Sequence, residues 1–463
     1  LLLTGAFPGW GLSWLAWIAL VPLLVCLRNL SPGQALRAGF FAGIVHYLTL
    51  VYWLAHTMNA YGNLPWVLSL AVLMLLAAYL AGYPAVFCLL LVRAGRRPIL
   101  SALMVPVLWT ALEYVRTLLF SGFPWELLGY SQYRILPLIQ IADIMGVYGV
   151  SCLVALGNCL IFLIYLSLSR QKWNQRNLSI KHALVCLVCF FIVLALVGGY
   201  GVWRMGGIEK AMAAAPPKRV SVIQGNIAQQ MKWDPAFQIA TIDRYIALSR
   251  KEAGANPHLI VWPETAMPFY FGHNVPLTKR VLNGIRSTDT DYIISSPGFI
   301  RMENRVAYRN RAFLLEAGHS NVSDTYDKAH LVPFGEYVPL KKWLPFLGKL
   351  VAQVGDFTAG EKGATLEWGN HRIGMLICYE LIFPYLSRET TRNGANLLLN
   401  ITNDAWYGRT SAPYQHFSMA VFRAVENRRS LARSANTGIS GFIDPTGKII
   451  SASPIFKEAA ITA

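Results

Sequence analysis

Charged residues are scarce in this chain. They account for 14% of its 463 residues, against 54% hydrophobic residues and a mean hydropathy of +0.40. A typical soluble domain has about a quarter charged residues, so this composition argues against a protein that is soluble throughout. The shortage is concentrated in residues 1–203, which consist of long apolar runs. We therefore predict a transmembrane helical bundle at 1–203, a linker at 204–217 and an α/β domain at 218–463.

Cysteine is scarce in the second domain. Six of the seven cysteines lie in the apolar half, where a thiol is usually a small buried hydrophobic group. Cys378 is the only cysteine after residue 200, so it has no partner in its own domain and stays a free thiol even in an oxidising compartment. The sequence has neither a Cys/His cluster with metal spacing nor a glycine-rich nucleotide fingerprint. We expect no metal and no cofactor.

Acidic residues are outnumbered, with 24 Asp and Glu against 41 Lys and Arg and a net charge of +17. The basic residues form no stripe interleaved with aromatic residues, which argues against nucleic acid as a partner. Many of them lie in short loops between apolar runs, where they favour anionic lipid headgroups and set the orientation in a membrane.

Six apolar runs are candidates for spanning helices, which need about 20 residues each. They are Ser13–Cys26, which is short, Phe40–Met58, Trp66–Leu91, Ile99–Leu119, Tyr148–Leu168 and Ala183–Val202. Loops rich in Arg and Lys alternate with loops that lack an excess of them. Because positive loops stay in the cytoplasm, everything after Val202 is predicted to lie outside it. The long loop Phe120–Gly146 is apolar, and either Trp125 and Tyr130 join an aromatic belt at the membrane interface or the loop packs against protein.

The second half alternates strand-like and helix-like segments, which predicts a layered α/β domain. The expected strands are Val220–Gln224, Leu259–Pro263, Tyr292–Ser295, Arg311–Leu315, Ile373–Cys378, Leu397–Ile401 and Gly441–Asp444. The expected helices are Ile239–Ala253, Thr278–Ile285, Pro384–Asn393 and Gln415–Asn427.

Three reactive side chains follow apolar or β-like runs in this half: Glu264 in "LIVWPET", Lys328 in "DTYDKAHLVPFGEYVPL" and Cys378 in "IGMLICYEL". A thiolate is a nucleophile whose pKa falls beside a cation, a carboxylate transfers protons, and an ammonium stabilises an oxyanion. Together they suit acyl transfer. The residue types alone leave open that Glu264 is a helix N-terminal charge, Lys328 a surface lysine and Cys378 a core cysteine.

The three segments, in this order, resemble the motifs of the nitrilase, or carbon–nitrogen hydrolase, superfamily. Its fold is an αββα sandwich with a Glu–Lys–Cys triad, and the likeness covers the chain from about Val220 to its end. With spanning helices ahead of this domain, and with "QGNIAQQMKWDP", "NDAWYG" and "QHFSMAVFRAVENRRSLARSANTGISGFIDPTG", the whole chain resembles the apolipoprotein N-acyltransferase family. Members of that family end in a further spanning helix, so we expect the sequence to be clipped at both ends.

The resemblance implies a ping-pong reaction in the bacterial inner membrane, with the second domain on the periplasmic side. Cys378 takes an acyl chain from a phospholipid, expected to be phosphatidylethanolamine, and passes it to the α-amino group of a diacylglyceryl-cysteine on an apolipoprotein. Glu264 is the general base, and Lys328 with a backbone N–H holds the oxyanion. The resemblance gives supporting roles to Glu336, Tyr379, Glu380 and Trp233. Nothing in the sequence demands an oligomer, and we expect a monomer.

Two other functions remain open from the sequence. A membrane-anchored amidase or nitrilase would use the same triad with water as the acceptor, although one helix would suffice as its anchor. A transporter would place charges inside the membrane, and Glu113 with Arg116 is the clear candidate. We also predict that Lys341–Val354, with its mixture of lysine and apolar residues, is a membrane-facing arm.

Overall fold

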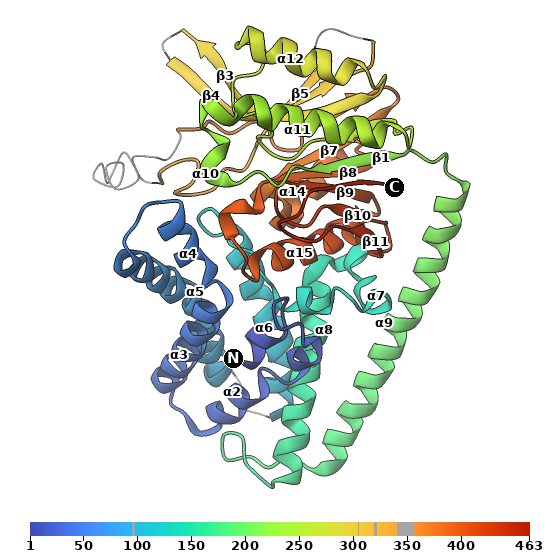
Figure 1. Cartoon of the computed structure of the whole chain (residues 1–463). Coiled ribbons are helices and arrows are strands. Elements are labelled where there is room, and N and C mark those ends of the chain that lie inside the picture. The colour runs from blue at the N-terminus through green and yellow to red at the C-terminus, as the bar shows by residue number, and fades with distance from the viewer. Residues whose placement is uncertain (95–97, 304, 319–321, 340–355) are drawn as a thin grey trace. The chain divides into compact units, whose positions relative to one another are not determined.

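The computed structural model describes residues 1–94, 98–303, 305–318, 322–339 and 356–463 (Figure 1). The predicted arm Lys341–Val354 lies outside the described residues. The chain divides into two compact units. The first comprises Leu1–Lys210 together with Thr410–Glu426, and the second comprises Ala211–Arg409 together with Asn427–Ala463.

The first unit is helical. Its elements before residue 215 are α1 (Leu2–Gly5), η1 (Ser13–Trp17), α2 (Val21–Cys26), η2 (Leu27–Asn29), α3 (Pro32–Leu50), α4 (Trp53–Ala60), α5 (Trp66–Ala94), α6 (Pro98–Leu118), η3 (Leu128–Gln132), α7 (Leu136–Ile139), α8 (Ala142–Leu168) and α9 (Ile180–Ala214). Among the described residues, four helices are long and apolar enough to cross a membrane, namely α5, α6, α8 and α9. The pair α3 and α4, bent by 52°, raises the number to five if it is one span.

The expectation of six spans is therefore too high for the part of the chain that is described. Ser13–Asn29 is not one continuous α-helix but a 3₁₀ turn, a six-residue α-helix and a second 3₁₀ turn. Pro22 is one cause, because it has no N–H to continue a preceding helix and is tolerated only in the first turn of α2.

Small residues let two helices of this unit approach closely. A Cβ on Gly43 of α3 would lie 2.8 Å from the Ala81 Cα of α5, and a Cβ on Gly39 would lie 2.9 Å from the Ala85 Cα. Such contacts are typical of helix pairs in membranes, where packing replaces the hydrophobic effect as the source of association.

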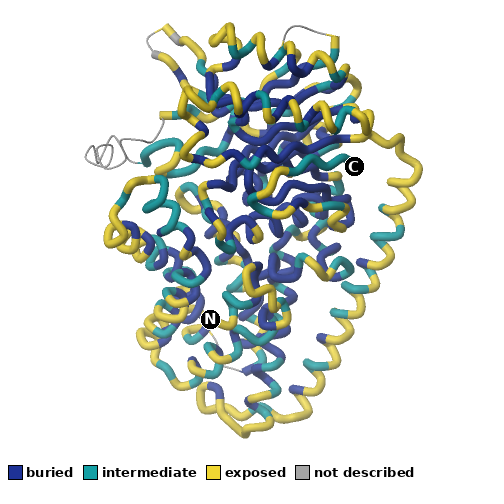
Figure 2. Tube along the Cα trace, viewed as in Figure 1, coloured by how far each residue is buried: buried dark blue, intermediate teal, exposed yellow. Residues whose placement is uncertain are grey.

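Helix α9 continues through most of the segment expected to be a linker. It ends at Ala214 rather than near Val202, so only the residues from Ala215 to Arg219 connect it to the next strand. The most apolar stretch of 18 residues in α9 has a mean hydropathy of 2.7, yet only 6% of that stretch is buried in the protein (Figure 2). An apolar helix with so little protein cover is suited to a lipid surrounding.

The loop after α6 is packed inside the first unit, so the aromatic-belt interpretation is wrong for its two marker residues. Trp125 and Tyr130 are both 0% exposed. Their partners lie on α15 (Ala412–Asn427), most of which clusters with this unit although it follows the strands of the second. The Trp125 Nε1 donates to Gln415 Oε1 (2.8 Å), and the Tyr130 hydroxyl accepts from Arg423 (2.8 Å).

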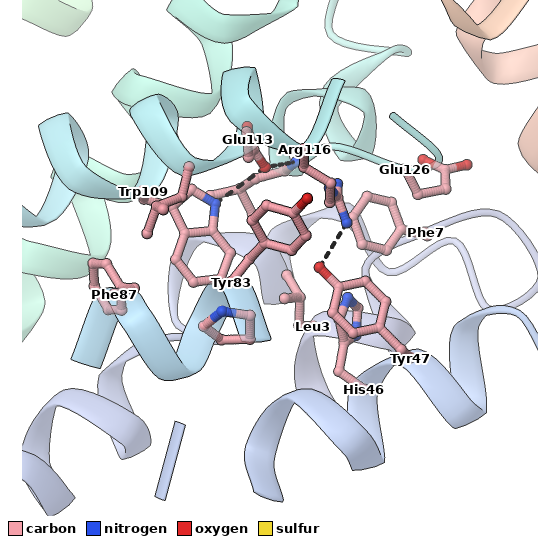
Figure 3. Close-up of a pocket in the computed structure, with 13 residues that line it drawn as sticks. Leu3, Phe7, His46, Tyr47, Tyr83, Phe87, Trp109, Glu113, Arg116 and Glu126 are labelled. Carbon is pink, nitrogen blue, oxygen red and sulfur yellow. Dashed lines mark hydrogen bonds between the residues drawn. The ribbon is translucent and has the colours of Figure 1, made fainter. Parts of the chain in front are cut away.

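Glu113 and Arg116, the charged pair inside α6, form hydrogen bonds to the same loop. Both line a small pocket together with His46, Tyr47 and Glu126 (Figure 3). The Glu113 Oε1 accepts from the backbone N–H of Leu128 (2.7 Å), and Arg116 donates to the Tyr47 hydroxyl (2.6 Å) and to the carbonyl of Trp125 (3.4 Å). These bonds give both charges a role in holding the loop.

The second unit contains two six-stranded sheets. One has the order β12-β1-β2-β3-β4-β5 and the other β11-β10-β9-β8-β7-β6. The strands are β1 (Val220–Gln224), β2 (Leu259–Val261), β3 (Asp291–Met302), β4 (Arg305–Leu315), β5 (Asp324–Asp327), β6 (Thr365–Trp368), β7 (His371–Ile377), β8 (Leu397–Thr402), β9 (Ser430–Ala435), β10 (Gly441–Ile443), β11 (Ile449–Ala452) and β12 (Ala459–Thr462). In each sheet the three central strands, β1–β3 or β7–β9, run parallel.

The sheets pack face to face and carry helices on their outer faces, as an αββα sandwich requires. The inner core joins side chains of both sheets, such as Val222 and Ile293 with Met375 and Ile401. On the outside of the first sheet lie α11 (Pro235–Ala253) and α12 (Val275–Arg286), and α14 (Pro384–Arg392) packs on β7. The remaining short helices are α10 (Gln229–Lys232), η4 (Cys378–Ile382) and η5 (Asp404–Tyr407). The expected fold class is confirmed.

Candidate active site

Cys378 is the residue immediately after β7 and the first residue of η4. Its φ of +53° is a left-handed conformation, rare for a residue with a side chain, and it turns the chain sharply at the strand end. The residue is only 8% exposed. Burial raises the pKa of the Cys378 thiol, and the nearby Glu264 carboxylate raises it further, while Lys328 opposes them. Lys328 lowers this pKa, as expected of a neighbouring cation, but burial and Glu264 outweigh it, so the resting group is a thiol.

Glu264 lies three residues beyond β2, and its charge acts on the Cys378 thiol. Its Oε1 accepts from the Asn310 side-chain amide (2.8 Å) and its Oε2 from the backbone N–H of Asn403 (2.9 Å). Its Oε1 also lies 3.7 Å from the Nζ of Lys328. Glu264 is 6% exposed, and Asn310, the N–H of Asn403 and Lys328 hold its carboxylate, so the orientation of that carboxylate is fixed.

Lys328 follows β5 directly and is 1% exposed. Its Nζ lies 2.9 Å from Glu336 Oε1. Burial disfavours the ammonium, but the carboxylates of Glu336 and Glu264 outweigh burial and raise the pKa of Lys328. Lys328 is therefore a permanent cation beside the thiol. Glu336 is itself fixed, because it also accepts from Asn310 (3.1 Å) and from the backbone N–H of Val332 (2.8 Å).

Glu380 joins the lysine segment to the cysteine segment. Its Oε1 accepts from the backbone N–H groups of Ala329 (2.7 Å) and His330 (2.9 Å), just after Lys328. Its Oε2 accepts from the N–H of Ile377 (2.6 Å), just before Cys378. The side chain is 0% exposed, and burial raises its pKa to about 7 against the effect of these donors and of Lys328. Glu380 thus acts as a structural brace of the site.

The other two expected residues lie in different surroundings. Tyr379 is 7% exposed, and its ring contacts Phe383 edge-on with a centroid distance of 5.1 Å. Trp233 follows α10 and is 50% exposed. A half-exposed indole fits the role near a substrate entrance that the family resemblance gives it.

Several polar residues of the site were not found from the sequence. Asn310, in the middle of β4, bridges Glu264 and Glu336. Asn403 lies in "NDAWYG", a motif that was quoted for the resemblance but given no role. Lys232, in "MKWDP", is 2% exposed, and its Nζ donates to the backbone carbonyl of Glu264 (3.1 Å). Their positions in the sequence could have indicated them, since Asn403 comes right after β8 and Lys232 comes right before Trp233.

The brace formed by Glu380 gives a test of stability. We expect Glu380→Gln to destabilise the second unit by about 2–3 kcal/mol at pH 4, because its NH₂ group replaces one of the two oxygens that accept from three backbone N–H groups. Since folding raises this pKa from 4.5 to about 7, the carboxyl group stabilises the fold below pH 4.5 and that contribution is lost as pH rises through 7. The variant should lose this pH dependence. Thermal unfolding in detergent measures both effects, with the exposed Glu367→Gln as control.

Both parts of the chain match known protein families. The family "Apolipoprotein N-acyltransferase N-terminal domain" matches residues 1–160, and "Carbon-nitrogen hydrolase" matches residues 219–463. The apolipoprotein N-acyltransferase of Geobacter metallireducens is 47% identical over 99% of this chain and 86% of its own length. The chain belongs to the apolipoprotein N-acyltransferase family. Proteins of the same name from Pasteurella multocida and Methylococcus capsulatus are 31% and 34% identical, over 98% and 100% of this chain and 85% and 88% of theirs.

Membership in this family confirms the resemblance drawn from the motifs and makes the chain an acyltransferase of the membrane. Among solved structures, an amidase from Nesterenkonia sp. AN1 has a TM-score of 0.39 and 20% identity over 53% of this chain and 92% of that one, a likeness too distant to bear on activity.

Proposed function

We propose that Cys378, Glu264 and Lys328 form the catalytic triad of a phospholipid-dependent N-acyltransferase. The donor is a phospholipid, with phosphatidylethanolamine expected, and the acceptor is the α-amino group of an N-terminal diacylglyceryl-cysteine on an apolipoprotein. The observation that supports this most is the environment of Cys378: a buried, protonated thiol beside an oriented carboxylate and a permanent ammonium. This is a nucleophile with its base and its oxyanion partner.

The first half-reaction forms a thioester. As the Cys378 sulfur bonds to the ester carbonyl carbon, the thiol proton passes to Glu264 and the carbonyl electrons move onto oxygen. The Lys328 ammonium and a backbone N–H near Cys378 stabilise that oxyanion. When the carbonyl re-forms, the ester C–O bond breaks, and the departing lysophospholipid oxygen takes the proton back from Glu264. The enzyme keeps the acyl chain.

The second half-reaction forms an amide. The acceptor amine attacks the thioester carbon, gives a proton to Glu264, and the C–S bond breaks. Cys378 leaves as a thiolate and recovers the proton from Glu264. A thioester reacts readily with amines, so the step needs no further energy source. Glu336, Tyr379 and Glu380 support the triad, and Trp233 borders the entrance.

The charge pattern supports a periplasmic position for the second unit, in the bacterial inner membrane. With α3 and α4 counted as one span, Arg28 before α3, the arginines after α5 and the Arg and Lys residues after α8 still fall on one side. The end of α9 then lies on the other side. The triad and its described partners come from one chain, so a monomer can carry the reaction.

The acceptor separates this function from an anchored amidase. Enzyme preloaded with phosphatidylethanolamine is expected to lose its acyl group on addition of a diacylated lipopeptide and to leave a triacylated peptide, which mass spectrometry of both products detects. A matched lipopeptide with an acetylated amino terminus should leave the acyl-enzyme intact. Hydrolysis of small amides with no acylation by any phospholipid would instead favour the amidase.

A further inference from the structure

Lys232 is a second buried lysine at the site, with no role in the triad. It ends α10, and its residue is 2% exposed although Trp233 beside it is 50% exposed. The chain therefore turns one side chain inward and the next outward at this point. Helix α10 is also attached to the site, because its Gln229 Oε1 accepts from the side-chain amide of Asn403, whose backbone N–H holds Glu264.

The ammonium of Lys232 acts on Glu264. The Nζ donates to the backbone carbonyl of Glu264 at 3.1 Å. The groups that interact with its charge are Glu264 and Cys378, the base and the nucleophile. A buried ammonium is unfavourable without anions close by, so its position points to a use of the charge.

The charges around Lys328 do not balance without Lys232. Glu264 and Glu336 bring two negative charges, and Lys328 brings one positive charge. Nearby, Asp404 is neutralised by Arg433 at 2.7 Å. Without Lys232, Glu264, Glu336 and Lys328 sum to one excess negative charge, which opposes the oxyanion formed when Cys378 attacks. With Lys232 these groups sum to zero, and Glu380 adds a negative charge only as the pH rises through about 7.

We propose that Lys232 is a positioning residue for acyl transfer, which fixes the backbone of Glu264 and supplies the second positive charge that Glu264 and Glu336 require. The inference rests on the proposed function. It also makes the reaction sensitive to pH, because burial lowers the pKa of Lys232 to about 8 even though Glu264 and Cys378 oppose the change. The charge is present below pH 8 and is lost above it.

The test is single-turnover acylation by phosphatidylethanolamine in detergent micelles, followed as release of lysophospholipid. Lys232→Met is expected to slow the chemical step about 100-fold, with the lipid concentration for half-maximal rate nearly unchanged. Lys232→Gln keeps a donor for the Glu264 carbonyl but lacks the charge, and should stay close to the Met variant. The control Lys251→Met, on the exposed face of α11, should behave as wild type. A Met variant within about twofold of wild type would overturn the proposal.

A pH profile excludes a merely structural role. Wild-type acylation should fall as pH rises through about 8, whereas Lys232→Arg, which stays charged, should not fall there. The other charged and titratable groups of the site include Glu264 after β2, Lys328 and Glu336 after β5, Cys378 and Glu380 in η4, Asp404 and Tyr407 in η5, and Arg433 in β9. They are common to both proteins, so the difference between the profiles reports on residue 232. If the Met variant does not fold, an unchanged fall in the Arg variant overturns the proposal by itself.

Alkylation of Cys378 keeps this inference separate from the proposed function. The rate of carbamidomethylation by iodoacetamide, read from the peptide that contains Cys378, needs no lipid. It should drop in Lys232→Met and not in Lys251→Met. If wild-type enzyme takes no acyl chain from phospholipid, the proposed function fails, whereas the alkylation series still decides the role of Lys232.

Discussion

Replacing Cys378 with alanine is expected to abolish the acyl-enzyme and to lower turnover by at least about 10⁴-fold, since removal of a covalent nucleophile leaves only binding and oxyanion stabilisation. Wild-type protein mixed with phosphatidylethanolamine should gain the mass of one acyl chain and lose it on treatment with hydroxylamine. Intact mass spectrometry checks both. The Ala variant should show no gain, because no other described thiol lies beside a base and a cation of this kind.

Cys189→Ala is the matched control, because Cys189 is an exposed thiol on α9. It should acylate as wild type does. An acyl adduct that persists in Cys378→Ala, or that disappears in Cys189→Ala, would move the nucleophile to another residue. The left-handed φ of Cys378 adds a second expectation for the same experiment: the alanine variant should fold, because the small side chain fits the same turn.

Replacing Glu264 with glutamine should slow thioester formation by about 10³- to 10⁴-fold. The thiol is protonated at rest because burial and Glu264 raise its pKa, so attack depends on transfer of the proton. The amide is not a base. It also brings an N–H₂ group to a place where both carboxylate oxygens accept, from Asn310 and from the N–H of Asn403. Lysophospholipid release in a single turnover measures the loss.

The control for this change is Glu458→Gln, a surface carboxylate 49% exposed that pairs with Arg244. It should leave the single-turnover rate unchanged. Acylation by Glu264→Gln at more than about a tenth of the wild-type rate would show that another group takes the thiol proton. A rate that recovers steeply at high pH would instead support the assignment, since hydroxide then replaces the missing base.

Much of the second unit follows from its apolar strands. All seven expected strands are present, because runs such as Leu397–Ile401 are apolar enough to be buried on both faces. Glu264 and Cys378 were found for the same reason, since each follows such a run. Five strands were missed, namely β5, β6, β9, β11 and β12. The sequence of β5, "DTYD", is polar, and that of β9, "SLARSA", contains Arg433 and Ser434, which are 0% exposed but satisfied by hydrogen bonds. Lys328 was identified from its motif, because the strand that precedes it was not predicted.

The contacts that complete the site could not be read from the sequence. Asn310 and Glu336 lie 26 residues apart, and Lys232 and Glu264 lie 32 residues apart, so only the folded chain shows that they meet. The direction of the Cys378 pKa shift could not be read from the sequence for a related reason. It depends on the balance of burial and Glu264 against Lys328, and burial is a property of the fold.

The chain leaves the second unit after Arg409, contributes Thr410–Glu426 to the first unit, including most of helix α15, and then returns to the second unit. With the passage near Lys210, the chain crosses from one unit to the other three times. A protein assembled by joining an anchor to a soluble enzyme would cross once. Here a catalytic half expressed alone would leave Gln415 and Arg423 without Trp125 and Tyr130, and a protease cut at the junction would not release it. The two halves are therefore separable neither as genes nor as fragments.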